Sequence, residues 1–290
     1  MSTAVHPDTT RAASSDGEER PAARRTGDLA RTLARGVGQT LLTVGFVVLL
    51  FVAYQLWFTD VLAAREQQQL AEEIQEQWAS APTVEQPAAP PAPAAGAPTQ
   101  APAAAPEPAP PAIDVAVGQP FSILHVPALG EEYARVVVEG VSQVELAQGP
   151  GHYIGTAMPG EQGNFAVAGH RVGHGAPFLD LDTLRPGDPI VVETEGHWFT
   201  YRVLGDPTTG DFSTDPSGIP GRRIVHPTDV AVISPTPGGT ADEPASGAYL
   251  TLTTCHPKYS AQQRLIIHAA LDGAPLSKAT APDGPSALNG

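Results

Sequence analysis

Residues 249–255 read YLTLTTC, and residues 264–268 read RLIIH. Both runs are short and rich in Leu, Ile, Thr and Tyr, a composition that is typical of β-strands. The sequence therefore predicts two neighbouring strands. The first ends at Cys255, the only cysteine of the chain, and the second begins at Arg264.

Further strand signals fill the region between residues 114 and 273, while the helix signal there is slight. Gly, Pro and Asp separate the strand-like segments, as expected at turns, and only residues 177–184 suggest one or two helical turns. Strands without long intervening helices predict an all-β antiparallel sandwich or closed barrel. The remaining predicted strands are residues 121–126, 133–139, 142–146, 164–169, 189–195, 198–204 and 230–234.

An uncharged stretch at residues 36–58 predicts a transmembrane helix. At about 1.5 Å per residue it is roughly 34 Å long, enough to cross a bilayer core of about 30 Å. Arginines dominate the segment before it and acidic residues the segment after it. The positive-inside rule then predicts a single-pass signal anchor in the cell membrane, with a cytoplasmic N-terminus and the later residues outside the cell.

Composition divides the rest of the chain into four further segments. Residues 1–35 are polar and predict a disordered cytoplasmic N-terminus, and residues 59–80 predict a juxtamembrane helix. Residues 81–113 form a Pro/Ala-rich linker; 11 Pro and 13 Ala among residues 81–112 are typical of a semi-rigid stalk. A folded domain is expected at residues 114–273, followed by a disordered tail at 274–290.

Charge and cysteine usage exclude several classes of function. The formal net charge of −15 argues against a nucleic-acid partner and against binding anionic lipid through a basic patch. The carboxylates are scattered rather than clustered as in a calcium loop, so neither a metal nor a cofactor is expected. A lone cysteine cannot form an internal disulfide. Cys255 is therefore either a small buried residue or a nucleophile.

A nucleophilic Cys255 requires a base or cation beside it, because only the thiolate attacks. His170 is the best-placed of nine histidines, since it closes the strand-like run at residues 164–169. His152, His174 and His268 are expected to be structural or exposed. Arg264 offers a fixed fork of donors that suits an oxyanion, although a surface ion pair is an equally good explanation.

Three separated motifs resemble the sortases, the cysteine transpeptidases of Gram-positive surfaces. They are TLTTC at residues 251–255 followed by Arg264, GHYIGTAMPG at 151–160, and GNFAVAGHR at 163–171. The segment from Cys255 to Arg264 is most similar to class E sortases. The resemblance covers residues 118–271 and implies an eight-stranded β-barrel with short helices. It also implies that Cys255 is the nucleophile, His170 the acid/base and Arg264 the residue that positions substrate.

The same resemblance implies substrates and partners. A sortase cleaves a sorting signal near the C-terminus of a secreted protein, between Thr and Gly, and transfers the protein to an amine of peptidoglycan or of its lipid-linked precursor. Class E resemblance implies a Leu-Ala-x-Thr-Gly signal. One departure from the family pattern is a longer segment at residues 205–221, which either reshapes the substrate groove or is a tolerated surface insertion.

Other classes fit the sequence less well. Papain-like peptidases place the cysteine before the histidine and near the start of a helix, whereas His170 precedes Cys255 here. L,D-transpeptidases carry a Ser-x-Gly-Cys-x-Arg motif, which TTCHP at residues 253–257 does not match. A stalked, non-catalytic β-domain for surface interactions remains the alternative, and it requires an unreactive Cys255.

Overall fold

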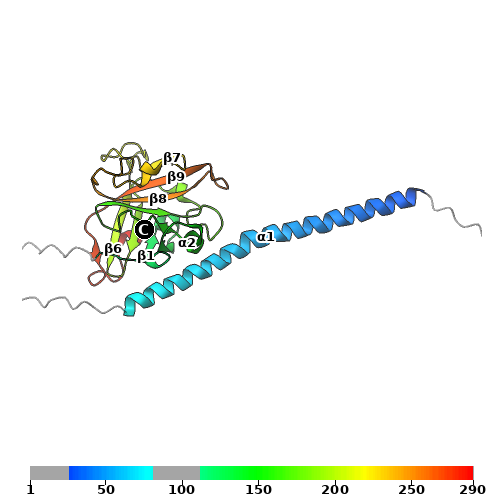
Figure 1. Ribbon diagram of the computed structural model, residues 1–290, viewed down its shortest axis with the longest axis horizontal. Helices are drawn as coiled ribbons and strands as arrows, with labels where there is room; N and C mark the ends of the chain where they lie inside the picture. The colour runs from blue at the N-terminus through cyan, green and yellow to red at the C-terminus, as the bar shows by residue number, and fades with distance from the viewer. Residues whose placement is uncertain (1–25, 81–111, 290) are drawn as a thin grey trace, which may run out of the picture. The chain divides into compact units, whose positions relative to one another are not determined.

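The computed structural model describes residues 26–80 and 112–289, which form two units (Figure 1). The first unit extends to Val52, and its described residues form the N-terminal part of helix α1, Thr26–Ser80. Residues Ala30–Val52 of α1 are long and apolar enough to cross a membrane, six residues earlier than the predicted span of 36–58. Of the predicted segments 1–35 and 81–113, residues 1–25 and 81–111 lie outside the described residues.

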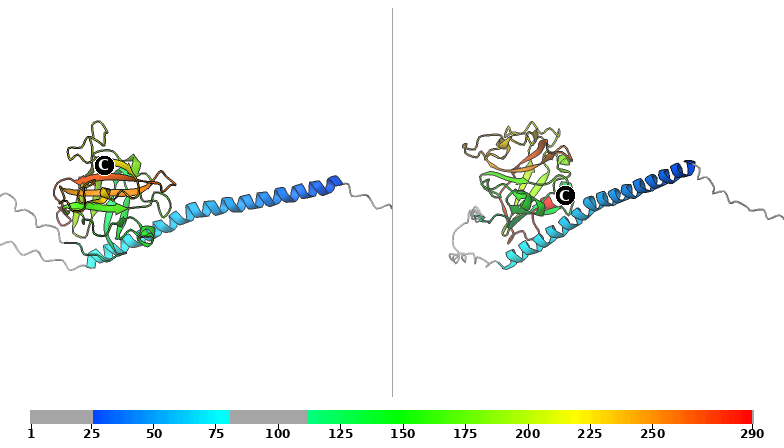
Figure 2. Two further views of the ribbon diagram at one scale, coloured as in Figure 1. Left: turned by 45° about the horizontal axis from the view of Figure 1, so that its top comes forward. Right: turned by 45° about the vertical axis from the view of Figure 1, so that its right-hand side comes forward.

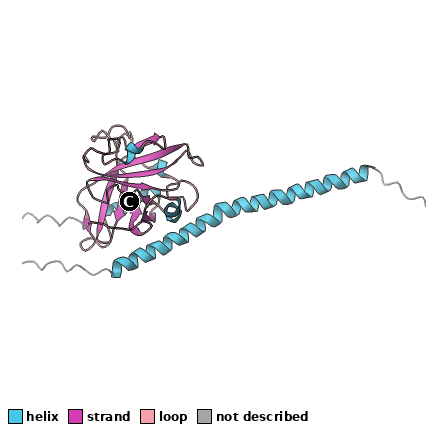
Figure 3. Cartoon of the chain, viewed as in Figure 1, coloured by secondary structure: helices cyan, strands magenta, loops and turns pink. Residues whose placement is uncertain are grey.

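The second unit contains the rest of α1 and a β-domain in which short helices lie between the strands (Figure 3). The helical segments of this domain are η1 Pro127–Leu129, α2 Gln143–Gln148, η2 Leu181–Thr183, η3 Val230–Ile233 and η4 Ser286–Leu288. The strands are β1 Pro120–His125, β2 Ala134–Glu139, β3 Gly151–His152, β4 Gly163–Ala168, β5 Pro189–Glu193, β6 His197–Val203, β7 Arg222–Val225, β8 Ala248–His256, β9 Gln263–Leu271 and β10 Leu276–Ser277.

Eight of these strands close into a barrel, which confirms the predicted fold class. The strand order is β6-β5-β1-β2-β3-β4-β8-β9, and a further pairing of β9 with β6 completes the ring. Strands β7 and β10 lie outside the ring, where they pair with β9 and β6. Two pairings, β2 with β3 and β4 with β8, are parallel, so the barrel is mixed rather than wholly antiparallel.

Alternate residues of the central strands fill the barrel. Leu250 and Leu252 of β8 and Phe165 and Val167 of β4 are almost completely buried in one apolar core. This spacing of two follows from the alternation of side chains along a strand. Because β4, β8 and β9 share this core, their relative register is fixed by packing as well as by backbone hydrogen bonds.

Two predicted strands are wrong. Residues 142–146 form the start of α2 instead, because Ser142 accepts a bond from the Val144 backbone while the Glu145 carboxylate accepts one from the Ser142 backbone. This capping box stabilises the first turn of a helix. Residues 230–234 form the 3₁₀ turn η3.

Beyond residue 273, where the sequence suggests a frayed tail, the structure holds two more elements. Strand β10 pairs with β6, and η4 follows it. Trp198 donates its indole N–H to the Ala281 carbonyl at 3.1 Å, and the Lys278 ammonium lies 2.7 Å from a Glu193 carboxylate oxygen. These contacts attach the C-terminal segment to the barrel.

The C-terminal part of α1 packs against β1 and β2 within the second unit. The side-chain amide of Gln67 pairs with the backbone of Val136 in the way that a neighbouring strand does. It accepts from the Val136 N–H at 2.9 Å and donates to the Val136 carbonyl at 3.4 Å. It also donates to the Gln148 carbonyl at 2.6 Å. Ile74 is fully buried against Ile123 and Val136. The helix thereby covers polar backbone groups and apolar side chains of the barrel.

Candidate active site

Strands β8 and β9 bring Cys255 and Arg264 together. The two strands are antiparallel neighbours, seen side by side in orange in Figure 2. Cys255 lies directly opposite Arg264 in their register. Directly opposed residues point to the same face of a sheet, with Cβ atoms about 4.5–5.5 Å apart. Cys255 is half-buried and forms no disulfide. The structure therefore places this pair as the sequence predicts.

His170 follows β4, the other neighbour of β8. Strands β4 and β8 are parallel, with Ala168 paired to Thr253. The Gly169 N–H donates to the Thr253 carbonyl at 3.0 Å, and the Thr254 hydroxyl donates to the Gly169 carbonyl at 2.8 Å. Extending this register by two residues sets His170 beside Cys255. All three predicted site residues thus lie at one end of three adjacent strands.

The imidazole of His170 is half-buried and stacks on that of His174. The ring centroids are 4.8 Å apart, with an interplanar angle of 25°. Burial lowers the pKa of His170 below its usual range, and the positive charge of a protonated His174 lowers it further. Among the described residues, His170 Nε2 is a buried nitrogen without a hydrogen-bond partner. No described protein group therefore occupies this nitrogen.

The Arg264 guanidinium is turned toward its own loop. Its Nη1 atom donates to the Ala261 and Gln263 carbonyls, at 3.0 Å each. Arginine cannot release its proton in proteins, so this side chain brings a permanent positive charge to the Cys255 face. The arrangement combines a thiol, an imidazole and a cation, which are the groups needed to form and stabilise an acyl-enzyme.

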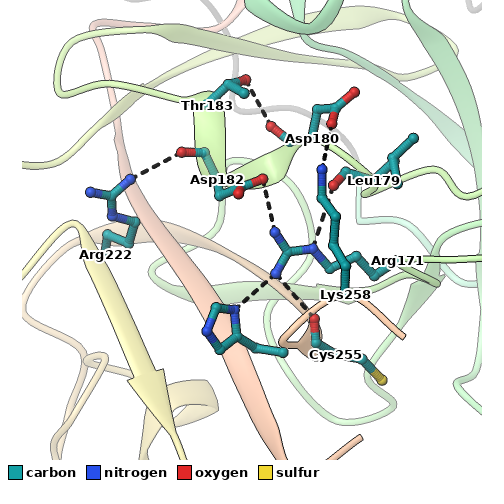
Figure 4. A network of polar contacts seen from close by, with 9 residues as sticks. Arg171, Leu179, Asp180, Asp182, Thr183, Arg222, Cys255 and Lys258 are labelled. Carbon is teal, nitrogen blue, oxygen red and sulfur yellow. Dashed lines mark hydrogen bonds and ion pairs between the residues drawn. The ribbon is translucent and has the colours of Figure 1, made fainter. Parts of the chain in front are cut away.

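Arg171 is a residue of this region to which the sequence analysis assigned no role. Its side chain is only 2% exposed, and Figure 4 shows it at the centre of a polar network. Nη1 donates to the Cys255 carbonyl at 3.4 Å and to His256 Nδ1 at 2.9 Å. Nη2 lies 2.8 Å from an Asp182 carboxylate oxygen, and Nε donates to the Leu179 carbonyl at 3.4 Å.

A buried polar ladder joins the three strands behind the site. Thr251 of β8 donates its hydroxyl proton to Asn164 of β4 at 2.7 Å, and the same hydroxyl lies 2.8 Å from His268 Nδ1 of β9. The Asn164 amide also donates to the Val232 and Ser234 carbonyls, at 3.1 and 3.0 Å. These bonds tie β4, β8 and β9 to η3 on the outer side of the barrel.

The other histidines singled out in the sequence have different surroundings. His152 is buried, with Nδ1 2.6 Å from a Glu139 carboxylate oxygen and Nε2 2.8 Å from the Thr156 hydroxyl, so it holds β2 and β3 together. His268 is buried in the ladder, whereas His174 belongs to the surroundings of His170. Within residues 26–80 and 112–289, no three His, Cys, Asp or Glu side chains are arranged to hold a metal ion.

The longer segment at residues 205–221 is held by its own hydrogen bonds. Asp206, Asp211 and Asp215 each accept from the backbone N–H two residues later. The Asp215 carboxylate also accepts from the Gly205 N–H at 2.9 Å, which closes the segment at its base. Arg222 stacks on Phe212 at 4.1 Å from the ring centroid. The segment is therefore an ordered addition to the barrel.

Comparisons with known proteins match this architecture. Residues 124–272 match the sortase domain family, about half of the chain. Sortase SrtE1 and sortase SrtE2 of Streptomyces coelicolor are 33% and 32% identical to 86% of this chain, which covers 60% of the first and 85% of the second. The structure of the SrtF sortase from Corynebacterium diphtheriae has 38% identity and a TM-score of 0.56 over 62% of this chain and 97% of its own. The chain therefore belongs to the sortase family of cysteine transpeptidases and is similar to its class E members.

Proposed function

We propose that this sortase cleaves a C-terminal sorting signal between Thr and Gly and joins the protein to an amine of the cell wall. The observation that carries the proposal is the placement of Cys255 opposite Arg264, with His170 at the end of the adjacent parallel strand. A nucleophile, a cation and an acid/base on one face fit an acyl transfer through a covalent intermediate.

In the first half-reaction the Cys255 thiolate attacks the carbonyl carbon of the signal threonine. The resulting oxyanion is stabilised by Arg264, whose guanidinium turns from the loop carbonyls toward the substrate. The bond between this carbon and the glycine nitrogen then breaks. Protonated His170 gives its proton to the leaving amine, and a thioester on Cys255 remains.

In the second half-reaction an amine attacks the thioester. His170 takes up the proton of the attacking nitrogen, the carbon–sulfur bond breaks, and the Cys255 thiolate leaves. The same residue thus acts as acid and then as base, and its lowered pKa favours the neutral imidazole that the second role requires. The acceptor is an amine of peptidoglycan or of its lipid-linked precursor.

The proposed signal is Leu-Ala-x-Thr-Gly, the signal that class E resemblance implies. The proposed location is the cell membrane, crossed once by the apolar part of α1, with the N-terminus in the cytoplasm and the barrel outside. The arginines before this segment and the acids after it support that orientation. Secreted proteins that carry the signal are the partners.

The test uses the full chain in detergent micelles. It is incubated with a quenched Leu-Ala-Glu-Thr-Gly peptide and with Leu-Pro-Glu-Thr-Gly, each with and without an amine acceptor, and products are identified by mass. We expect cleavage between Thr and Gly, transfer to the amine, and preference for the Ala peptide. Cys255→Ala serves as the control and should form no thioester.

Three other outcomes would change the assignment. Preference for the Pro peptide would keep the transpeptidase and replace the signal. Turnover retained by Cys255→Ala would remove Cys255 from the nucleophile role. If neither peptide is cleaved and the thiol does not react with alkylating reagents, the non-catalytic surface domain becomes the better description.

A further inference from the structure

Arg171 links three segments of the chain that meet behind the candidate site. Arg171 directly follows His170. Its side chain bonds the backbone of Cys255 and the ring of His256. It also bonds Leu179, just before η2, and Asp182 within η2. Four of the five N–H donors that a guanidinium carries are used in these contacts. The side chain therefore holds the end of β8 and the η2 region in fixed positions relative to the segment that carries His170.

The burial of this charge calls for an explanation. The Arg171 side chain is 2% exposed, whereas its carboxylate partner, Asp182, is 44% exposed. Removing a charge from water costs several kcal/mol, and well-packed apolar residues often stabilise a fold as well as a buried ion pair does. Stability alone is a weak reason for an arginine here, so the acceptors that it reaches are the more informative feature.

Two of the four acceptors, the Cys255 carbonyl and His256 Nδ1, belong to the reactive end of β8. Figure 4 shows the Cys255 carbonyl facing the Arg171 guanidinium while the Cys255 sulfur points away. A guanidinium can only donate, so His256 Nδ1 accepts with its lone pair. Arg171 thus holds the backbone of the nucleophile and the ring of the next residue without occupying the face from which the thiol attacks.

We propose that Arg171 is a positioning residue for the transpeptidation reaction: its guanidinium sets the distance between Cys255 and His170. The inference rests on the proposed function of those two residues. Cys255 lies at the end of β8 and His170 lies just beyond β4, where the backbone pairing between these two strands ends. The bonds from Arg171 to Cys255 and His256 continue the link between the two segments beyond the last backbone pair. Reacting groups must be held to within about 0.5 Å, and a misplacement of about 1 Å can cost on the order of 100-fold in rate.

Two substitutions test the role. Arg171→Gln removes the charge and most of the donors, and we expect kcat to fall on the order of 100-fold with little change in KM, because the peptide itself is not contacted. Arg171→Lys keeps the charge beside Asp182 but loses the planar fork, so it should fold and still lose about tenfold or more in kcat. The Lys variant keeps the test decisive if the Gln variant does not fold.

Arg222→Gln is the matched control. Arg222 also donates to this region, from Nη1 to the Asp182 backbone carbonyl at 3.0 Å, but its bonds do not reach β8 (Figure 4). We expect it to keep the wild-type kcat. A loss equal to that of the Arg171 variants would mean that any weakening near η2 lowers the rate, and would overturn the proposal.

A second readout separates this proposal from the proposed function. The rate at which iodoacetamide alkylates Cys255 in the full chain requires no sorting signal. We expect Arg171→Gln and Arg171→Lys to slow alkylation several-fold at a temperature where both remain folded, because the thiol loses its alignment with His170. Folded variants with wild-type alkylation rates and kcat within about twofold of the wild type would refute the positioning role. If the wild type cleaves no peptide, slower alkylation still supports it.

Discussion

The buried ladder makes a quantitative prediction through His268. Thr251 donates its hydroxyl proton to Asn164, so the 2.8 Å contact with His268 requires the His268 Nδ1 to carry a proton. Among the described residues, Nε2 of this ring is buried without a partner. Protonating Nε2 would bury an uncompensated charge. Burial, with a smaller contribution from the nearby Arg223 charge, lowers the pKa of His268 to about 3.

This pKa makes the fold sensitive to acid. An unfolded histidine has a pKa of about 6.5, so the unfolded chain takes up this proton first as the pH falls. The free energy of unfolding therefore decreases between about pH 6.5 and pH 3. At 1.36 kcal/mol per pH unit, the loss from His268 alone is about 2 kcal/mol at pH 5.0 and close to zero at pH 7.5.

The assay compares the wild type with His268→Gln by urea unfolding in detergent micelles at both pH values, followed by near-ultraviolet circular dichroism. The substitution lowers stability at pH 7.5 through lost packing and a changed bond to Thr251. Between pH 7.5 and 5.0 we expect the wild type to lose about 2 kcal/mol more than the variant. Parallel losses, within about 0.5 kcal/mol, would refute the reasoning about a buried neutral imidazole.

Three further predictions concern the site and the helix. His174→Phe keeps a ring against His170 but removes the charge of residue 174, which should raise the pKa of His170. The limb of the kcat/KM pH profile that belongs to His170 should then move to higher pH. An unchanged limb would mean that His174 does not influence the titration of His170. Arg264→Lys should lower kcat/KM sharply while the thermal unfolding temperature stays unchanged, and a near-normal rate would make Arg264 structural. Gln67→Ala should lower the free energy of unfolding by about 1–3 kcal/mol, whereas Gln69→Ala on the exposed face serves as a control with little effect.

The sequence predicts the central strands well because their signals are local. The runs that form β8 and β9 are long and rich in strand-forming residues, and their register follows from a shared core. The proximity of Cys255 and Arg264 follows from that pairing, so it could be predicted from the amino-acid sequence. The capping-box spacing of Ser142 and Glu145 also indicates the start of α2, but the apolar residues around them favour a strand.

Other features depend on contacts between distant segments. Arg171 is next to His170 in sequence, yet its burial follows from Asp182 and from the end of β8, which no local pattern links to it. His174 has a left-handed backbone, with φ of 49°, that brings its ring back over His170. A non-glycine residue in that conformation is uncommon, and nothing in the local sequence announces it. Strand β10 is two residues long, too short for a composition signal.

Because α1 packs against the barrel, the Pro/Ala-rich stretch joins two segments that also contact each other directly. Both the residues that precede it, up to Ser80, and those that follow it, from residue 112, belong to the second unit. The stretch is therefore not the only connection between α1 and the barrel. A protease that cuts within residues 81–111 would leave two chains that remain associated through Gln67, Ile74 and the stacking of Lys278 on Trp78. Separation of the barrel from α1 would then require dissociation of the helix as well as cleavage.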